Sequence, residues 1–105
     1  MFSRALQSDD LWEGELRRCV VDGVPVLLLR QGDGIFAYVD RCAHLGAPLS
    51  SGRLVGGRIV CAIHHWEYDA CSGAGVNPCK VALVPLAVRV EGGVVWVDAV
   101  PANDG

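Results

Sequence analysis

Two short segments of the chain each combine one cysteine with one histidine. Cys42 and His44 are separated by one residue, and Cys61 and His64 are separated by two. A thiolate is a soft, anionic metal ligand, whereas an imidazole binds as a neutral group. Two segments that each supply one thiolate and one imidazole predict a single metal centre held between two loops.

This set of ligands is typical of a [2Fe–2S] cluster with mixed ligation, in which two thiolates bind one iron and two imidazoles bind the other. The imidazoles raise the reduction potential above that of an all-cysteine cluster. One alternative is a structural zinc site, but such sites usually group cysteines with cysteines and histidines with histidines. The other alternative is that no metal binds. The spacing favours one iron–sulfur cluster, with Cys42 and Cys61 on one iron and His44 and His64 on the other.

Residues beside the second segment need separate interpretations. His65 adjoins a predicted ligand, but the spacing selects His64, so we expect His65 at the surface beside the cluster. Trp66 has two interpretations, as core beneath the loop or as part of an exposed apolar rim that meets partners, and we favour the rim. Trp12 and Trp96 are predicted to be packing residues.

Three further cysteines bring the total to five. Cys19 lies in an apolar stretch and is predicted to be a buried hydrophobic residue. Cys71 and Cys79 flank a glycine-rich segment. Structural disulfides are rare in reducing compartments, so we expect free thiols there, although a disulfide or a spare ligand role stays open.

Length and composition limit the class of protein. The 105 residues predict one domain, residues 1–105, and a hydrophobic fraction of 51% is enough for a core. The net charge of −3 and the lack of a basic stripe argue against nucleic acid as a partner. The sequence shows neither an apolar signal core near its start nor a stretch of about eighteen apolar residues, so we expect a soluble, cytoplasmic protein without a membrane partner.

The pattern of turns and apolar residues predicts an all-β fold. Asp-Gly and Gly-Gly pairs separate short runs rich in valine, isoleucine and leucine, as in β-hairpins. Strands are predicted at residues 16–21, 24–29, 35–39, 53–55, 58–60, 87–90 and 94–97, with a short helical turn at 8–12.

Each cysteine–histidine segment directly follows a predicted strand, so the ligands come from two loops of a β scaffold. Residues of about 40–80 are predicted to form a cluster-binding lobe. This lobe is inserted into an antiparallel β-sandwich base formed by residues 1–39 and 81–100. Because the lobe is an insertion between base strands, we expect both parts to form one domain.

With these motifs, the chain resembles the Rieske ferredoxins of bacterial oxygenase systems. Their pattern is C-x-H followed by C-x-x-H-x-W-x-[FY]-[DN], which residues 42–44 and 61–69 match. The resemblance covers nearly the whole chain. Residues 8–16 and 73–78 are also similar to the toluene monooxygenase Rieske ferredoxins. The resemblance implies the Rieske fold and one [2Fe–2S] cluster on the four predicted ligands.

The chain departs from the high-potential Rieske proteins of cytochrome bc-type complexes. Those proteins join an extra cysteine from each loop as a disulfide, where this chain has Ala47 and Ile63. They also have a serine that donates a hydrogen bond toward the cluster, where this chain has Trp66. Fewer donors lower the potential, so the comparison implies a low-potential ferredoxin. Tyr68 is either a remaining donor or a half-buried strand residue with its hydroxyl in water.

The resemblance implies a monomeric one-electron carrier without turnover of its own, and therefore not an enzyme. Its partners would be an NADH-dependent flavin and iron–sulfur reductase and an oxygenase hydroxylase, a diiron enzyme acting on an aromatic or alkene hydrocarbon. The docking face would surround His44, His64, His65 and Trp66. The sequence shows no nucleophile–base pair, phosphate loop or nucleotide fingerprint that would indicate catalysis.

Three other functions stay open. The chain could serve an aromatic-ring dioxygenase that has its own Rieske centre, or it could be the small Rieske subunit of a nitrite reductase-like enzyme. A permanent subunit would present a large apolar interface, whereas a shuttle needs only a small docking patch. The last alternative is a zinc-stabilised binding module without a redox role.

Overall fold

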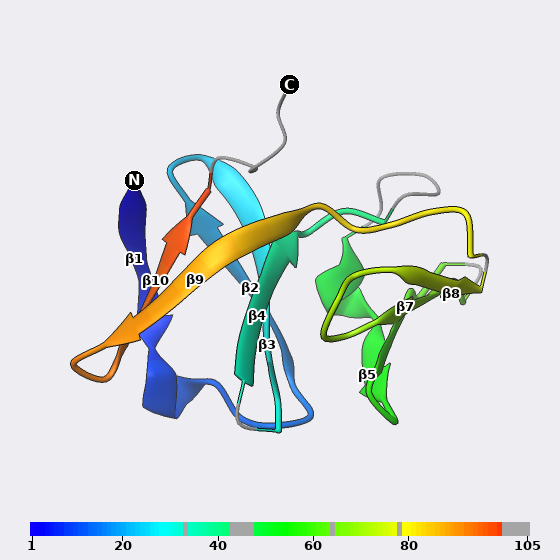
Figure 1. Cartoon of the computed structure of the whole chain (residues 1–105), viewed down its shortest axis with the longest axis horizontal. Coiled ribbons are helices and arrows are strands. Elements are labelled where there is room, and N and C mark those ends of the chain that lie inside the picture. The colour runs from blue at the N-terminus through cyan, green and yellow to red at the C-terminus, as the bar shows by residue number, and fades with distance from the viewer. Residues whose placement is uncertain (33, 43–47, 64, 78, 100–105) are drawn as a thin grey trace.

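The computed structural model describes residues 1–32, 34–42, 48–63, 65–77 and 79–99. Within these ranges the chain forms ten β-strands and two short 3₁₀ helices, which confirms the predicted all-β class (Figure 1). Among the same residues no helix is long and apolar enough to cross a membrane.

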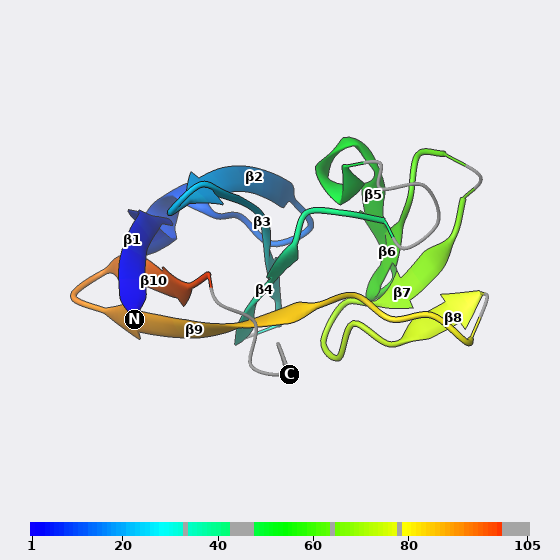
Figure 2. The same cartoon turned by 90° about the horizontal axis from the view of Figure 1, so that it is seen from above.

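Six strands form the base, and all of their pairings are antiparallel. In chain order they are β1 (Phe2–Gln7), β2 (Leu16–Val21), β3 (Val24–Gln31), β4 (Gly34–Val39), β9 (Pro85–Glu91) and β10 (Val94–Asp98). The spatial order is β1-β10-β9-β4-β3-β2. The sheet curls until its two edges approach each other, and Cys19 Sγ on β2 donates to the Ala5 carbonyl on β1 at 3.4 Å (Figure 2). One curled sheet thus supplies both layers of the predicted sandwich.

Local sequence explains most of the base strands. Asp22 and Gly23 both have positive φ, as do Gly92 and Gly93, which is the conformation that two-residue hairpin turns require. The predicted strands there are confirmed. Strand β1 was not predicted, because a register shift between Arg4 and Leu6 interrupts the alternation of apolar and polar residues.

The lobe is inserted between β4 and β9, as predicted. Its elements are the 3₁₀ helix η2 (Leu49–Ser51) and the strands β5 (Arg53–Val55), β6 (Arg58–Val60), β7 (Glu67–Asp69) and β8 (Gly75–Asn77). The strands form a second antiparallel sheet in this order. Sequence analysis predicted β5 and β6, which the Gly56-Gly57 pair joins, but missed the equally short β7 and β8, because no Asp-Gly or Gly-Gly pair lies between them. The predicted turn at 8–12 is the 3₁₀ helix η1 (Ser8–Asp10).

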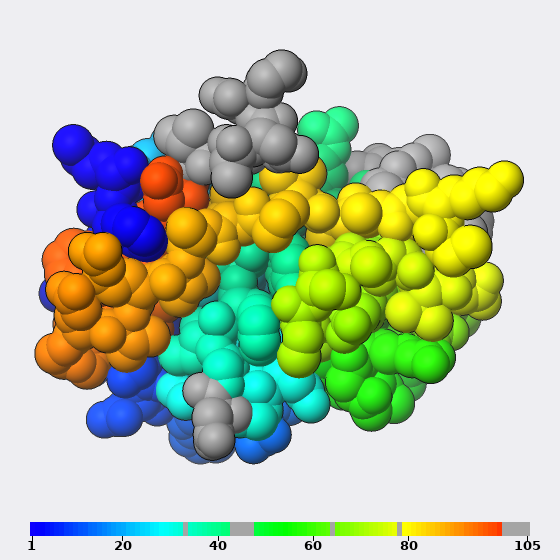
Figure 3. Space-filling view, in the orientation of Figure 1, coloured from blue at the N-terminus to red at the C-terminus, as the bar shows by residue number. Residues whose placement is uncertain are grey.

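Two hydrophobic clusters hold the molecule together. The first lies inside the curled base sheet and is built from Leu11, Val21, Val26, Leu28, Ala37, Leu86, Val95, Val97 and Ala99. The second, here called the shared core, joins base and lobe, which are in direct contact (Figure 3). It contains Leu27, Leu29, Tyr38, Cys42, Leu49, Ile59, Cys61, Tyr68, Ala70 and Leu83.

The tryptophans only partly match the prediction. Trp96 on β10 is half-buried, but the prediction that Trp12 is a packing residue is wrong. The Trp12 side chain is 71% exposed, and its ring N–H donates to the Asp9 carbonyl at 3.2 Å. The base sheet closes around Leu11 instead, which is 1% exposed, so the neighbouring indole points outward.

Candidate metal centre

The two predicted cysteine ligands come together at the junction of base and lobe. Cys42 follows the end of β4, and Cys61 directly follows β6. Both are almost fully buried, with 1% and 0% exposure, and both belong to the shared core. The predicted ligands His44 and His64 lie outside the described residues, so their positions stay predictions.

Close backbone contacts shape the second ligand loop. The Cys61 N–H donates to the Trp66 carbonyl at 2.8 Å, which closes the loop, and His65 within it has a φ of 58°. Gly52, just before β5, lies so close to the Val60 carbonyl that any Cβ there would collide with it. A side chain at Gly52 would therefore push the end of the first loop away from the strand that leads to Cys61.

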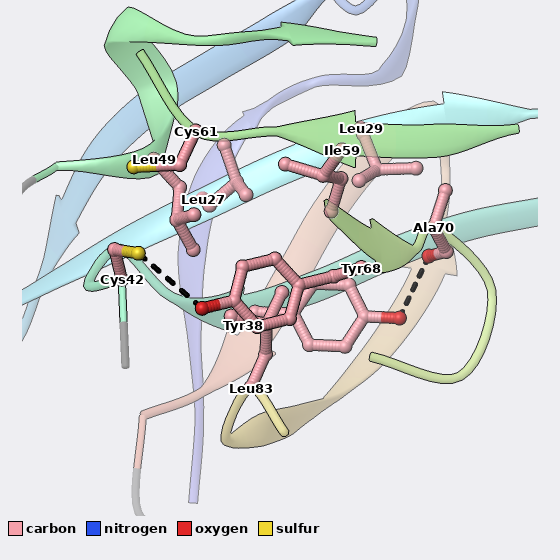
Figure 4. Packing of buried hydrophobic residues seen from close by; sticks show 10 residues of the cluster. All are labelled: Leu27, Leu29, Tyr38, Cys42, Leu49, Ile59, Cys61, Tyr68, Ala70 and Leu83. Atoms are coloured by element: carbon pink, nitrogen blue, oxygen red, sulfur yellow. Dashed lines mark hydrogen bonds between the residues drawn. The ribbon is translucent and has the colours of Figure 1, made fainter. Parts of the chain in front are cut away.

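Two buried tyrosines belong to the shared core, and their hydroxyls point in different directions (Figure 4). The Tyr68 hydroxyl lies 3.3 Å from Cys42 Sγ. The Tyr38 hydroxyl donates to the Ala70 carbonyl at 2.7 Å. Sequence analysis left the Tyr68 hydroxyl either in water or directed at the cluster, and the structure buries it against a predicted ligand sulfur.

The electrostatics of the two thiols fit a metal site. Burial raises the pKa of the Cys61 thiol; a backbone hydrogen bond from Ile63 opposes this, and the adjacent Cys42 thiol adds to the upward shift. Two adjacent buried thiolates repel each other and need a cation to offset their charge. With Cys42 as a thiolate, only the Tyr68 hydroxyl can donate in their contact. The donors present therefore fit the thiolate half of the predicted cluster.

Within the described ranges, no group of three or more His, Cys, Asp or Glu side chains is placed to hold a metal ion. Cys42 and Cys61 alone do not make such a group, and the other two predicted ligands lie outside those ranges. The shared core therefore supplies a two-sulfur half-site.

A buried carboxylate that sequence analysis missed connects this site to the base. Asp40 has a fully buried side chain and lies just before Cys42. Its Oδ2 accepts hydrogen bonds from Arg18 Nη1 on β2 at 2.8 Å and from Ser50 Oγ on η2 at 2.7 Å. Its Oδ1 accepts from the Ser50 N–H at 2.9 Å. No sequence spacing relates these three residues, so only the folded chain reveals that Asp40 positions the far end of the first ligand loop.

The flanking residues are placed as follows. His65 is exposed, and Ile63 on the same loop is 44% exposed. Trp66 is half-buried and packs against the shared core, so the structure favours the packing interpretation over the exposed rim. Ala47 lies outside the described residues.

The remaining cysteines are free thiols in the structure. Cys19 is half-buried, and burial raises the pKa of its thiol. Cys71 and Cys79 are both exposed, in agreement with the expectation of free thiols.

Comparisons with known proteins agree on one domain type. A family model for the Rieske [2Fe–2S] domain matches residues 2–90. The ferredoxin component of the alkene monooxygenase system of Xanthobacter autotrophicus is 35% identical over 94 residues, which cover 89% of this chain and 77% of that relative. Ferredoxin CarAc of Metapseudomonas resinovorans is 36% identical over 92 residues, 86% of each chain.

A similar solved structure is the complex of reduced oxygenase and oxidised ferredoxin in carbazole 1,9a-dioxygenase. One of its chains matches with a TM-score of 0.88 and 31% identity. The match covers 98% of this chain and 97% of that chain. The likeness therefore extends over the base and the lobe together.

Proposed function

Because the chain belongs to the Rieske [2Fe–2S] domain family, we propose that Cys42 and Cys61 hold one iron of its single cluster and that His44 and His64 hold the other. The observation that carries this assignment is the burial of both thiols side by side, with the Tyr68 hydroxyl on one of them. When bound, the cluster supplies a one-electron redox couple. The chain is an electron carrier of an oxygenase system, like its relatives, and not a catalytic oxygenase.

The protein's own groups prepare the site for this role. The shared core keeps water from the two sulfur atoms, and with Cys42 bound as a thiolate the Tyr68 hydroxyl donates a hydrogen bond to its Sγ. Asp40 fixes the return of the first loop, and the Cys61–Trp66 hydrogen bond fixes the second. Contacts that fix the ends of both loops help to keep the geometry of the site unchanged when its charge changes by one.

The electron reaches the chain from an NADH-dependent flavin and iron–sulfur reductase and leaves it for an oxygenase hydroxylase. For the hydroxylase we favour a diiron monooxygenase that oxidises an alkene or an aromatic hydrocarbon. The support is the 35% identity to the alkene monooxygenase ferredoxin component over 89% of this chain. We propose that the chain acts as a cytoplasmic monomer, because a shuttle must bind and leave two partners in turn. The shared core between base and lobe supports a single domain, residues 1–105.

A second candidate is the ferredoxin of an aromatic-ring dioxygenase. It is favoured by the 36% identity to Ferredoxin CarAc and by the TM-score of 0.88 to a chain of the carbazole 1,9a-dioxygenase complex. Both candidates need the same cluster and differ only in the terminal oxygenase.

Reconstitution distinguishes the two. The purified, cluster-loaded protein is combined with NADH, a flavin reductase and either a diiron alkene or toluene hydroxylase or the oxygenase component of carbazole 1,9a-dioxygenase. We expect hydroxylated product with the diiron enzyme that depends on the added chain. Product only with the dioxygenase would select the second candidate. If neither oxygenase accepts electrons while the reduced protein remains competent toward a small oxidant, the proposed function is wrong.

A further inference from the structure

Charge is distributed unevenly between the two parts of the chain. Without the buried Asp40 at its border with the base, the lobe spans residues 41–80 and has four basic residues and two acidic ones, a net charge of +2. The remainder has five basic and ten acidic residues, a net charge of −5. The molecule is acidic overall, but the part that contains the predicted cluster is basic. A charged partner is therefore oriented before contact, with its acidic surface toward the lobe.

Strand register places the basic groups on the outer face of the lobe sheet. Leu54, Ile59 and Tyr68 are paired across β5, β6 and β7 and face the shared core. Side chains alternate along a strand, so their neighbours point outward. In the outer layer, Arg53 on β5 is paired with Val60 on β6, which in turn is paired with Glu67 on β7.

This outer face is hollowed. The hollow has a volume of about 500 Å³ and is here called the arginine hollow. Its lining includes Arg53, Val55, Arg58, Val60, His65 and Glu67. Through His65 it reaches the loop that contains the predicted ligand His64. An acidic group bound in the hollow would lie beside the ligand loop, where an electron enters or leaves.

The two arginines in the hollow differ in their partners. Arg58 Nη1 pairs with Glu67 Oε1 at 3.1 Å. In the part of the chain that the structure describes, the Arg53 side chain is exposed and makes no hydrogen bond or ion pair. A guanidinium presents a planar fork of donors that binds a carboxylate through two parallel hydrogen bonds. Arg53 is thus available to a carboxylate from outside, while Glu67 holds Arg58 beside it.

We propose that the arginine hollow is the docking site for an acidic side chain of the oxygenase component, with Arg53 as the residue that binds the carboxylate. This inference rests on the proposed function, because it takes the oxygenase component as the partner. Val55, 53% exposed, and Val60 provide apolar surface around the charged pair. The mixture of a small apolar surface and one or two charges suits a complex that must form and dissociate quickly.

Another possible occupant is a second copy of this chain, whose acidic base could meet the basic lobe. A shuttle that blocks its own ligand loop could not deliver electrons, so we commit to the oxygenase component. The variants Arg53→Gln and Arg53→Glu test this choice, with Arg4→Glu as a control of matched charge. Arg4 is exposed on β1 in the base, outside the lobe.

The first experiment measures binding and electron delivery. The probe is whichever oxygenase component the wild-type protein reduces fastest in the reconstitution above. We expect Arg53→Gln to raise the dissociation constant about tenfold and Arg53→Glu to raise it further, mainly because association is slower. The dissociation constant of both variants should also depend less on salt. Arg4→Glu should have little effect. Iron content and reduction potential should stay unchanged in all three variants, which separates a docking role from a structural one.

The second experiment needs no protein partner. Reduced protein is mixed with the anionic oxidant Co(EDTA)⁻ or with the cationic oxidant Co(NH₃)₆³⁺, each of which takes one electron as cobalt(III) becomes cobalt(II). At low ionic strength, Arg53→Glu should slow the anionic reaction by roughly threefold and accelerate the cationic one. Arg4→Glu changes the net charge by the same amount but lies in the base, so it should change both rates clearly less than Arg53→Glu.

The outcomes separate this inference from the proposed function. If the wild-type protein delivers electrons and Arg53→Glu delivers them equally well, the docking site is wrong while the function stands. If no oxygenase accepts electrons, the rates with the cobalt oxidants test the hollow by themselves. Rates that are the same in Arg53→Glu as in the wild-type protein would show that the hollow is not a charged surface near the electron exit. A wild-type dimer at low salt that Arg53→Glu dissociates would assign the hollow to a second copy and overturn the proposal.

Discussion

The base and the lobe are both antiparallel sheets, but they are stabilised in different ways. Base strands are five to eight residues long and enclose an aliphatic cluster of their own. The four lobe strands have three residues each, and their inner face packs only against the core that they share with the base. Such short strands make few ladder hydrogen bonds and are marginal alone. The lobe therefore depends on attachments to the base.

Three of these attachments are visible. The shared core buries apolar side chains from both parts, the Tyr38 hydroxyl binds the Ala70 carbonyl, and Asp40 ties η2 to β2. The proposed cluster would stabilise the lobe itself, since all four ligands come from its two loops and metal binding across them contributes folding free energy. The base supplies stability and the lobe supplies chemistry. Perturbations of the attachments should therefore affect the lobe first.

The largest effect is expected from the ligands. Cys42→Ser, His44→Ala, Cys61→Ser or His64→Ala should each abolish the cluster, and the lobe should lose order while the base stays folded. Iron and labile sulfide, two of each per chain in the [2Fe–2S] form, measure the loss. His65→Ala is the matched control and should keep full iron. A chain that keeps its cluster without His64 but loses it without His65 would reverse the ligand assignment.

Removal of the Asp40 carboxylate should separate lobe from base. Asp40→Ala deletes three hydrogen bonds of a buried charged group and should cost about 3 kcal/mol of local stability. Native-state hydrogen exchange should then be faster at the Gly52 and Cys61 amides but unchanged in β10. Arg18→Gln is the comparison variant: it removes the cation beside the buried carboxylate but keeps both Ser50 hydrogen bonds and an amide donor, so the amides of η2 and the second loop should be affected less than in Asp40→Ala. Equal acceleration in β10 would show that the two parts open as one unit.

Alkaline pH should weaken the contact between base and lobe at Tyr38. Burial, together with the nearby Cys71 and Asp69, raises the pKa of its hydroxyl above the ordinary value of 10.0. The folded chain keeps this proton when the unfolded chain has lost it. The stabilisation is therefore complete below pH 10.0 and declines as pH rises above it, by at most about 1.4 kcal/mol per pH unit.

The free energy of unfolding, measured with denaturant between about pH 9 and 11 on either side of the ordinary tyrosine pKa, checks this decline. Tyr38→Phe should be less stable at neutral pH, because it loses the hydrogen bond to Ala70, but it should show a shallower alkaline decline. Parallel slopes for the two proteins would mean that Tyr38 does not cause the decline.

Tyr38 and Tyr68 allow an effect on the reduction potential to be distinguished from an effect on packing. Tyr68→Phe removes the donor to Cys42 Sγ, and such donors stabilise the reduced state. A differential effect of about 1 kcal/mol corresponds to a potential lower by roughly 40 mV for one electron. Tyr38→Phe removes a hydroxyl from the same core without touching sulfur and should leave the potential unchanged. Equal shifts in both variants, measured by redox titration, would indicate a general packing effect.

The smallest effect is expected at the exposed thiols of the lobe. Cys71→Ser and Cys79→Ser should keep full iron and an unchanged potential, because both side chains are exposed and unlinked. The potential of the wild-type protein also tests the low-potential prediction: a value near the top of the roughly −150 to +300 mV range of Rieske centres would contradict it. Loss of iron in Cys71→Ser or Cys79→Ser would contradict the assignment of these two cysteines as free thiols.

Much of this protein could be predicted from sequence because the signals are local. Turn pairs such as Asp22-Gly23 and Gly92-Gly93 fix hairpins through backbone conformation alone. The spacing of cysteine and histidine within each segment indicated the cluster, and the position of both segments after strands indicated an inserted lobe. These features depend on neighbours within a few residues, which a sequence displays directly.

Other features depend on residues that are distant in sequence. The contact of Asp40 with Arg18 and Ser50, the orientation of the Tyr68 hydroxyl and the outward position of Trp12 follow from how base and lobe pack. The register of β5, β6 and β7, which gathers Arg53 and His65 around one hollow, is likewise absent from any local pattern. The sequence by itself determined the ligand types and the β-hairpins. Only the tertiary structure decided which hydroxyl meets sulfur and which arginine is left without a partner among the described residues, because burial and cross-strand pairing bring together groups that the chain keeps far apart.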